Sequence, residues 1–322
     1  MAAAGNTSIL CVGQLVADIV VRPVSGLPVP GRTDFVEELE LLAGGGAANT
    51  AAVLAKLGVQ TRLAALIGQD TLGDAALAEL RGAGVGLDTV WREAGVRTGA
   101  VLVVVSRSGE RSFLYRSGGN ERLANRHVPD AVLKAAGLVH VGGALKLLSL
   151  DLAELMGRAK AFGGTTSLDT DWDPRGNWMR RLQDALPKID YLLTNQEEAA
   201  MLTGKEAPRE AAQALLARGS PAVVVKRGEQ GALLATRAGV TEWPAYRVEV
   251  RDTTCAGDAF VAGFLLGVSR GWGLAEAMRV GNAAGALCTT QVSHRAITCL
   301  EQLLGLVKAQ PAPGPTSQGG VL

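Results

Sequence analysis

The most informative segment of the chain is Asp252-Thr253-Thr254-Cys255-Ala256-Gly257-Asp258-Ala259-Phe260. Two small residues, Ala256 and Gly257, stand where a helix is expected to begin, so the N–H groups of its first turn can bind an anion. Asp258 follows in the same turn, where a carboxylate would repel a bound phosphate. General-base catalysis on a hydroxyl that attacks the phosphate would explain this placement. The alternative is an acidic residue that only caps the helix.

Upstream of this segment, short apolar runs alternate with helical patterns, which is typical of a parallel sheet covered on both faces. Strands are predicted at Ser8–Val12, Leu138–Val141, Thr166–Asp169, Tyr191–Thr194 and Ala222–Lys226. Helices are predicted at Ala47–Leu57, Gly73–Arg81, Leu150–Phe162, Glu197–Leu202, Asp252–Gly267 and Leu274–Thr289. The expected fold is therefore a three-layer α/β structure with a central, mostly parallel sheet.

A smaller β-sheet is expected from two separated pieces, about 14–42 and 97–116. Its strands are predicted at Ile19–Val21, Asp34–Leu42, Thr98–Val105 and Arg111–Tyr115, with a further strand elsewhere at Thr61–Ile67. A small sheet on an α/β body suggests a lid over a cleft at the carboxyl ends of the strands. We expect a single domain over residues 1–308 and a disordered tail over 309–322, which is rich in proline and glycine.

Composition and charge exclude several classes of protein. Hydrophobic residues make up 48% and charged residues 20%, which indicates a globular rather than a disordered chain. The net charge of +1 argues against a broad nucleic-acid or anionic-membrane surface, so we expect neither partner. The chain shows neither a basic leader nor 18 consecutive apolar residues, and its four cysteines form no C-x-x-C pair. We therefore expect a cytoplasmic protein without structural zinc.

A glycine-rich turn, Gly44-Gly45-Gly46-Ala47-Ala48-Asn49, precedes a predicted helix. Its glycines allow the backbone to approach a polyhydroxy ligand, and Asn49 can both donate and accept hydrogen bonds. Tight packing of strand against helix is the alternative. A dinucleotide fingerprint would require glycine at position 49, and no G-x-x-x-x-G-K-[ST] phosphate loop is present.

Two further polar motifs follow predicted strands. Asn195 and Glu198 form an N-x-x-E pattern, which suits a site for magnesium and phosphate but also an ordinary helix cap. Lys226-Arg227-Gly228-Glu229-Gln230-Gly231 places a lysine and two glycines after a strand. This turn could approach a nucleotide, or it could simply join two strands of a hairpin.

These motifs, in this order, resemble the signatures of the ribokinase-like (pfkB) carbohydrate kinases. The matching patterns are G-G-x-x-x-N at Gly44, N-x-x-E at Asn195, [TK]-x-G-x-x-G at Lys226 and D-T-x-x-A-G-D at Asp252. The resemblance extends from Asp18 to Ala286, and it implies a ribokinase-like fold and an ATP- and magnesium-dependent sugar kinase. Cys255 departs from the usual glycine or alanine, but it is also small.

The resemblance also implies a role for each matched position. The implied catalytic residues are Asp258, Ala256 and Gly257. The implied substrate-binding residues are Asp18, Gly44, Gly45, Asn49, Arg116, Asp171 and Arg175. The implied nucleotide-binding residues are Asn195, Lys226, Gly228, Gly231, Thr254 and Asn282. The implied metal sites are Glu198 with Asn195 for magnesium through water, and Asp252 with Thr254 for a monovalent cation such as K⁺. Arg175 could instead belong to a turn of salt-bridged surface charges.

The sequence leaves the sugar undecided. Val16 stands where ribokinases often carry asparagine, and Gly46 where kinases of phosphorylated sugars often carry lysine. A ketohexose, a pentose and a sugar acid all remain open. A nucleoside kinase of the same fold is an alternative, with Phe35, Phe113 and Tyr115 as lid aromatics for a base. A catalytically silent sugar-binding regulator is another.

Two features outside the site motifs complete the expectations. Related kinases often pair through their lids, so we expect a homodimer formed through the β-lid. His294, in the run Val292-Ser293-His294-Arg295-Ala296, is expected to be an exposed loop histidine.

Overall fold

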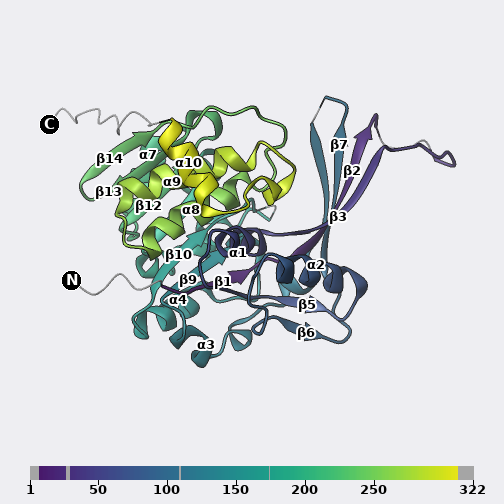
Figure 1. Cartoon of the computed structure of the whole chain (residues 1–322). Helices are drawn as coiled ribbons and strands as arrows, with labels where there is room; N and C mark the ends of the chain where they lie inside the picture. Colours follow the sequence, from purple (N-terminus) through teal and green to yellow (C-terminus); the bar gives the residue numbers. More distant parts are fainter. Residues whose placement is uncertain (1–6, 27–29, 109, 174, 311–322) are drawn as a thin grey trace.

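The computed structural model describes residues 7–26, 30–108, 110–173 and 175–310, and an eight-stranded sheet runs through its centre (Figure 1). The strand order is β14-β13-β12-β11-β10-β9-β1-β4, and all neighbours are parallel except those of β13. The strands are β1 (Ile9–Gly13), β4 (Thr61–Ala64), β9 (Leu138–Gly142), β10 (Thr165–Asp169), β11 (Tyr191–Asn195), β12 (Ala222–Lys226), β13 (Ala232–Thr236) and β14 (Gly239–Trp243).

Two hydrophobic cores lie on opposite faces of this sheet, because successive strand residues point to opposite sides. Ile9 and Cys11 of β1 pack into one core, and Leu10 and Val12 pack into the other. The first core is covered by α1 (Gly46–Lys56), α2 (Thr71–Gly82), α8 (Ala256–Ser269), α9 (Leu274–Cys288) and α10 (Leu300–Ala309). The second is covered by α3 (Asp130–Lys134), α4 (Leu152–Ala161), α5 (Trp178–Leu182), α6 (Gln196–Thr203) and α7 (Pro208–Leu216). The predicted three-layer α/β architecture is confirmed.

A second sheet of four strands stands away from the body (Figure 1). It consists of β3 (Glu38–Gly44), β2 (Val16–Val24), β7 (Gly99–Ser106) and β8 (Arg111–Arg116), in that spatial order. One face of this lid carries a small apolar cluster of Val20, Leu42 and Val103, against which Val292 of the body packs. The lid therefore touches the body close to the segment that precedes α8.

Several element boundaries differ from the predictions. The predicted strand over 61–67 is two strands, because β4 joins the main sheet whereas β5 (Leu66–Gly68) pairs with β6 (Trp91–Glu93). The strand predicted from Asp34 begins only at Glu38. The predicted tail starts too early, because α10 reaches Ala309 and Gln310 bonds to the backbone of Arg247. Residues 311–322 lie outside the described part of the chain.

The parallel strands β1, β9, β10, β11 and β12 all end at the same edge of the sheet, and this edge positions the site. The segments after β1 and β3 lead into the lid and into α1, so residues distant in sequence meet there. None of the helices formed by the described residues is long and apolar enough to span a membrane.

Candidate active site

Asp258 lies in the first turn of α8, which begins directly after Cys255 in a left-handed conformation with φ 63°. Its Oδ2 accepts a hydrogen bond of 2.7 Å from Nδ2 of Asn49, near the beginning of α1. Burial raises the pKa of Asp258 to about 7, and the nearby charge of Asp169 acts in the same direction. A carboxylate with such a pKa can take up a proton near neutral pH, as a general base must.

Asp18 and the glycine-rich turn form the wall nearest the lid. Asp18 lies on β2 opposite Leu42 of β3, and a methyl group added at Gly44 would lie 2.1 Å from Oδ2 of Asp18. Gly45 has φ 98°, and a methyl group there would lie 2.7 Å from the carbonyl oxygen of Gln14. Gly45 therefore requires glycine, whereas a side chain at Gly44 would displace the carboxyl group of Asp18. Burial raises the pKa of Asp18 to about 7, with a smaller effect from Glu79.

An unpartnered acceptor lies beside the Asn49–Asp258 bond. Oδ1 of Asn49 is buried and has no hydrogen-bond partner within the described residues. A buried carbonyl oxygen without a donor is costly, and a ligand hydroxyl at this position would satisfy it.

A further wall of the site includes Gln14 and Lys146, two residues that the sequence analysis did not predict. Nε2 of Gln14 donates to the hydroxyl of Tyr115 at 3.2 Å, and Nζ of Lys146 lies 5.2 Å from the centre of the Tyr115 ring. Lys146 also forms an ion pair of 2.8 Å with Asp171, which was predicted to bind substrate. Asp171 has φ 69°, an unusual conformation for a residue other than glycine. No local motif marks Gln14 or Lys146, so only the fold could have identified them.

Arg116 and Arg175 do not lie against these walls in the structure, and their roles as substrate residues stay predictions. Tyr115, not Arg116, is paired through β7 with the face that carries Asp18, and alternate residues point to opposite faces. Arg116 instead donates to the carbonyl oxygen of Thr98 at 3.0 Å. Arg175 is exposed and forms an ion pair with Glu121, as in the surface-charge alternative.

Lys226 is the last residue of β12 and lies at the carboxyl edge of the sheet. Its Nζ forms an ion pair of 2.7 Å with Oδ1 of Asp169, and a methyl group at Gly257 would lie 3.4 Å from this nitrogen. Burial alone would lower the pKa of Lys226, but the charges of Asp169 and Glu198 outweigh it and raise the pKa. A permanent positive charge therefore lies beside the N-terminus of α8, where it favours anions further. Asp169 was not predicted as a site residue.

Asn195 and Glu198 form a capping box at the start of α6, the structural alternative raised by the sequence. Oδ1 of Asn195 accepts from the backbone N–H of Glu198 at 2.8 Å, and Glu198 accepts from the hydroxyl of Thr170. The described residues contain no group of three or more His, Cys, Asp or Glu able to hold a metal ion. The buried carboxylates of Glu198 and Asp169 nevertheless fit magnesium, which prefers oxygen ligands and keeps several of its waters.

Two of the predicted nucleotide-binding residues, Gly231 and Asn282, meet at the end of β14. Gly231 has φ 82°, and a methyl group there would lie 2.0 Å from the carbonyl oxygen of Trp243. Nδ2 of Asn282, on α9, donates to the same oxygen at 3.4 Å. Gly228 has φ 56° and open space around its Cα. The β12–β13 connection is thus a hairpin turn with open space at Gly228.

Asp252 and Thr254, which were predicted to hold a monovalent cation, contact an arginine side chain in the structure. The guanidinium of Arg111, from lid strand β8, contacts Oδ1 of Asp252 at 3.1 Å and also bonds to the hydroxyl of Thr254. His294 is not exposed as predicted, because only 2% of its surface is accessible and its ring meets Nζ of Lys56 at 2.9 Å.

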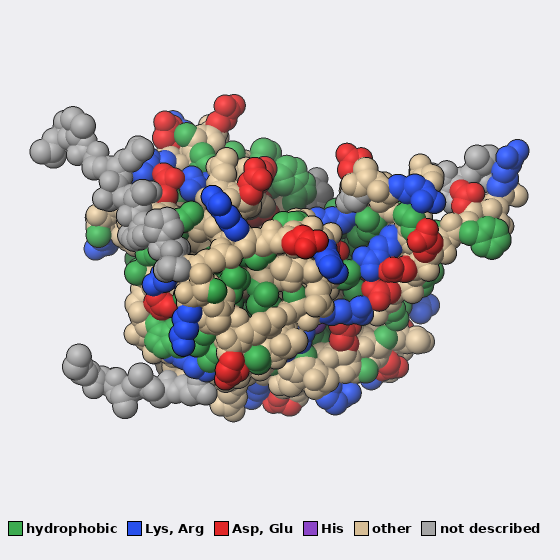
Figure 2. Space-filling view, turned by 45° about the horizontal axis from the view of Figure 1, so that its top comes forward, with side chains coloured by type: hydrophobic (Ala, Val, Ile, Leu, Met, Phe, Trp, Pro, Cys, Tyr) green, Lys and Arg blue, Asp and Glu red, His purple; other side chains and the backbone are tan. Residues whose placement is uncertain are grey.

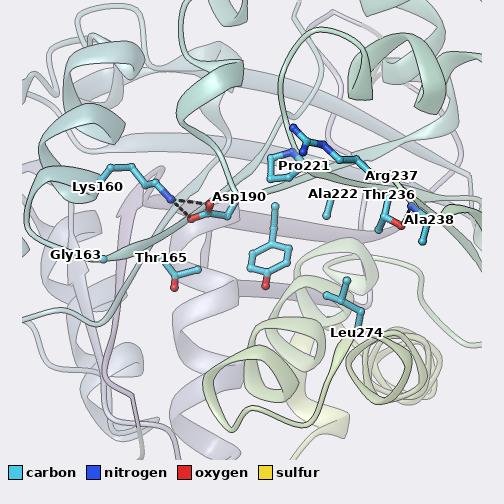
Figure 3. Close-up of a pocket in the computed structure, with 12 residues that line it drawn as sticks. Lys160, Gly163, Thr165, Asp190, Pro221, Ala222, Thr236, Arg237, Ala238 and Leu274 are labelled. Carbon is cyan, nitrogen blue, oxygen red and sulfur yellow. Dashed lines mark hydrogen bonds and ion pairs between the residues drawn. The ribbon is translucent and has the colours of Figure 1, made fainter. Parts of the chain in front are cut away.

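A separate hollow of the described surface lies away from this site (Figure 3). Its lining includes Lys160, Asp190 and Ala222 at the amino ends of the strands, and it contains none of the predicted site residues. The Lys160–Asp190 ion pair of 2.7 Å borders it. The candidate site is therefore the carboxyl edge under the lid, where Figure 2 shows charged side chains of both signs between lid and body.

Comparison with known proteins finds several sugar kinases that are similar to this chain. The chain is 28% identical to the 2-dehydro-3-deoxygluconokinase of Bacillus subtilis over 76% of this chain and 79% of that protein. It is 28% identical to fructokinase-2 of Zea mays over 89% of each chain. It is similar in structure to the ribokinase of Arabidopsis thaliana complexed with ribose and ATP, with a TM-score of 0.82, 26% identity and coverage of 94% and 99%.

The model of the pfkB family carbohydrate kinases matches residues 6–302, which is nearly the whole chain. This match confirms the family indicated by the ordered motifs, and the structural similarity confirms the ribokinase-like fold. The chain belongs to the pfkB family of carbohydrate kinases, which are phosphotransferases with an alcohol group as acceptor.

Proposed function

We propose that this protein transfers the γ-phosphate of ATP to a hydroxyl of a small carbohydrate, with Asp258 as the general base. The observation that carries the proposal is the placement of Asp258. Its carboxylate lies in the first turn of α8, it bonds to Asn49, and its pKa is raised to about 7. A helix cap that served stability alone would have no need of a carboxylate removed from water.

In the proposed reaction, the sugar lies between Asp18, Asn49 and Asp258. Asp258 takes the proton of the reacting hydroxyl, and the oxygen attacks the γ-phosphorus in line. The N–H groups of Ala256 and Gly257 and the ammonium of Lys226 stabilise the negative charge that develops on the transferred group. The lid excludes water, which would otherwise compete as the acceptor.

The nucleotide is proposed to lie along the turn at Gly228 and toward Asn282, with its phosphates near Lys226. Glu198 and Asp169 would hold magnesium through water, and the bound ion would neutralise charge on the phosphates. Solved relatives with ATP support this donor, including the Arabidopsis thaliana ribokinase complex. Asn195 contributes by orienting Glu198 through the capping box.

The substrate class remains a small polyhydroxy compound. Relatives at equal identity carry names that refer to different sugars, so similarity does not choose among a ketohexose, a pentose and a sugar acid. A nucleoside would require an enclosed aromatic pocket for its base. Phe35 is 95% exposed and Phe113 is 58% exposed, so neither encloses such a pocket.

The test is ADP release with magnesium-ATP against fructose, ribose, tagatose, ketodeoxygluconate, inositols and nucleosides. Release with one compound class, absent in Asp258→Asn, is the expected result. Release with a sugar that is undiminished in this variant would exclude Asp258 as the base. Folded protein that binds a sugar but releases no ADP would instead support the silent regulator.

We also propose that the protein forms a homodimer through the outer face of its lid. The strand pairing places Ile19, Leu41, Leu102 and Leu114 on the face opposite Asp18. Leu114 is 64% exposed and Leu41 is 40% exposed, so this lid face is apolar and uncovered. A second copy would bury it on both subunits at once, as a two-fold interface does.

Light scattering at micromolar concentration tests the dimer. Leu41→Lys with Leu114→Lys is expected to give half the wild-type mass, because two ammonium groups would be buried against apolar surface. Met201→Lys, at an exposed position on α6, is the matched control and keeps the dimer. A monomeric wild-type protein would refute the proposal.

A further inference from the structure

The side chain of Arg111, on the lid, reaches the segment of the body that precedes α8. Arg111 is the first residue of β8, next to the tip of the β7–β8 hairpin, where it pairs with Val105. Its two terminal nitrogens bond to the hydroxyls of Thr253 and Thr254, and Nη1 lies 3.1 Å from Oδ1 of Asp252. One side chain thus holds three consecutive residues of another region of the chain.

This contact bears on the geometry of the anion site. Oδ1 of Asp252 also accepts from the backbone N–H of Thr254 at 2.6 Å, so the carboxylate fixes the turn that leads into α8. The first N–H groups of that helix, at Ala256 and Gly257, follow directly. The Asp252 and Arg111 side chains are only 13% and 23% exposed, so water screens their ion pair little.

Other donors within the chain occupy the oxygens around this turn. Sγ of Cys288 lies 3.5 and 3.2 Å from the carbonyl oxygens of Thr254 and Ser293, and its one proton can be donated to either of them. Nζ of Lys56 donates to the carbonyl oxygen of His294 at 3.1 Å. The oxygens that could attract a monovalent cation thus already meet a guanidinium, a thiol and an ammonium. The residues present do not fit a bound K⁺ ion.

We propose that Arg111 is a positioning residue that replaces a monovalent cation and couples lid closure to the anion site. When the lid closes, the guanidinium orders residues 252–254, and the N–H groups at the start of α8 are then aimed at the transferred phosphate. When the lid opens, the guanidinium of Arg111 leaves residues 252–254 and the turn becomes less ordered. Phosphate binding at the start of α8 and closure of the lid over the sugar therefore occur together. This inference rests on the proposed kinase function, and it adds that catalysis is independent of K⁺.

The test compares wild type, Arg111→Ala, Arg111→Lys and the control Arg107→Ala, which removes an exposed arginine from the same hairpin. Arg111→Ala is expected to lower kcat on the order of 100-fold, because a displaced catalytic loop has effects of this size. It is also expected to weaken ATP binding and to raise the KM for the sugar, because the coupling between the two sites is reciprocal. Added guanidinium is expected to restore part of kcat in Arg111→Ala but not to change Arg107→Ala. Wild-type kcat is expected to be equal in potassium, sodium and tetramethylammonium salts.

Two outcomes would overturn the inference in an active enzyme: Arg111→Ala behaving like Arg107→Ala, or strong activation of wild type by K⁺. Calorimetric titration with magnesium-ATP provides a readout that needs no turnover. Equal affinity of wild type and Arg111→Ala would also refute the inference, whereas an inactive wild type that binds ATP more tightly than the variant counts against the proposed function alone. Thermal unfolding checks that Arg111→Ala folds. Arg111→Lys keeps the positive charge but lacks the forked guanidinium, so its kcat is expected to lie between those of wild type and Arg111→Ala.

Discussion

The two edges of the central sheet are built from the same strands, but their chemistry differs. At the carboxyl edge, Asp169, Lys226 and Asp258 lie close together, and each has a raised pKa. At the amino edge, the larger hollow of Figure 3 is bordered by the Lys160–Asp190 pair, whose side chains are 43% and 27% exposed. An exposed pair of this kind contributes at most about 1 kcal/mol to stability.

The difference shows that the direction of the chain, and not the size of a hollow, places the chemistry. Parallel strands followed by helices bring helix N-termini to the carboxyl edge, as at α6 and α8. Free N–H groups there attract anions, whereas helix C-termini present carbonyl oxygens to the other edge. The predictions below test this contrast with matched changes at the two edges.

The largest effect is expected at Asp258. Asp258→Asn keeps the shape and the bond to Asn49 but cannot accept the proton, so kcat should fall by about a thousandfold. Asp190→Asn, the matched change at the amino edge, should keep kcat within about twofold of wild type, as expected away from the site. Steady-state ADP release measures both. Equal losses in the two variants would remove the contrast between the edges.

A smaller effect is expected at Lys226. Lys226→Met removes the ammonium beside the N-terminus of α8 and leaves Asp169 without its partner. We expect kcat to fall by about a hundredfold, because one fixed donor to a developing oxyanion is worth that much. The variant should also unfold at lower temperature, since the partner of a buried charge is lost. Lys160→Met is the control, and a drop in its kcat similar to that of Lys226→Met would contradict the assignment.

The pH dependence of kcat/KM should reflect the ionisation of Asp18 and Asp258, the two carboxyl groups next to the proposed sugar position. Asp18 and Asp258 both have a pKa of about 7. Asp258 must be ionised to take up a proton, and Asp18 must be ionised to accept sugar hydroxyls through both oxygens. Below pH 7, kcat/KM should therefore fall by about tenfold per pH unit for each group that must ionise. In Asp18→Asn only Asp258 should titrate, so kcat/KM should fall less steeply with decreasing pH. A flat profile between pH 5 and 8 would show that neither carboxyl titrates there.

The smallest effect is expected on stability. A raised pKa means that the folded state holds the proton of Asp258 more firmly than the unfolded state does. The contribution of Asp258 to the free energy of unfolding therefore declines as pH rises from about 4 to about 7. Buried His140 and His294 have lowered pKa values and act in the opposite sense, so the difference between wild type and Asp258→Asn is the useful quantity. From pH 5 to 8, the Tm of wild type should fall by a few degrees relative to this variant.

Much of this molecule could be predicted from local patterns. Apolar runs separated by helical segments predicted the parallel sheet, and the small residues around Asp258 predicted where a helix begins. Both depend on the periodicity of neighbouring side chains, which is local information. The glycine-rich segment at Gly44 also predicted a turn before a helix, and α1 begins at Gly46.

The tertiary structure decided which of the candidate side chains meet. Strand register placed Tyr115 on the Asp18 face of the lid and Arg116 on the other, because a shift of one residue reverses the face. Packing of the four-stranded sheet against the body brought Arg111 to Asp252 across 141 residues of sequence, and the order of strands in the main sheet brought Lys226 to Asp169. Such contacts carry no local signal, because they depend on how separate elements pack. The sequence alone therefore determined the elements and the helix that carries the base, whereas packing between elements selected the charges that surround it.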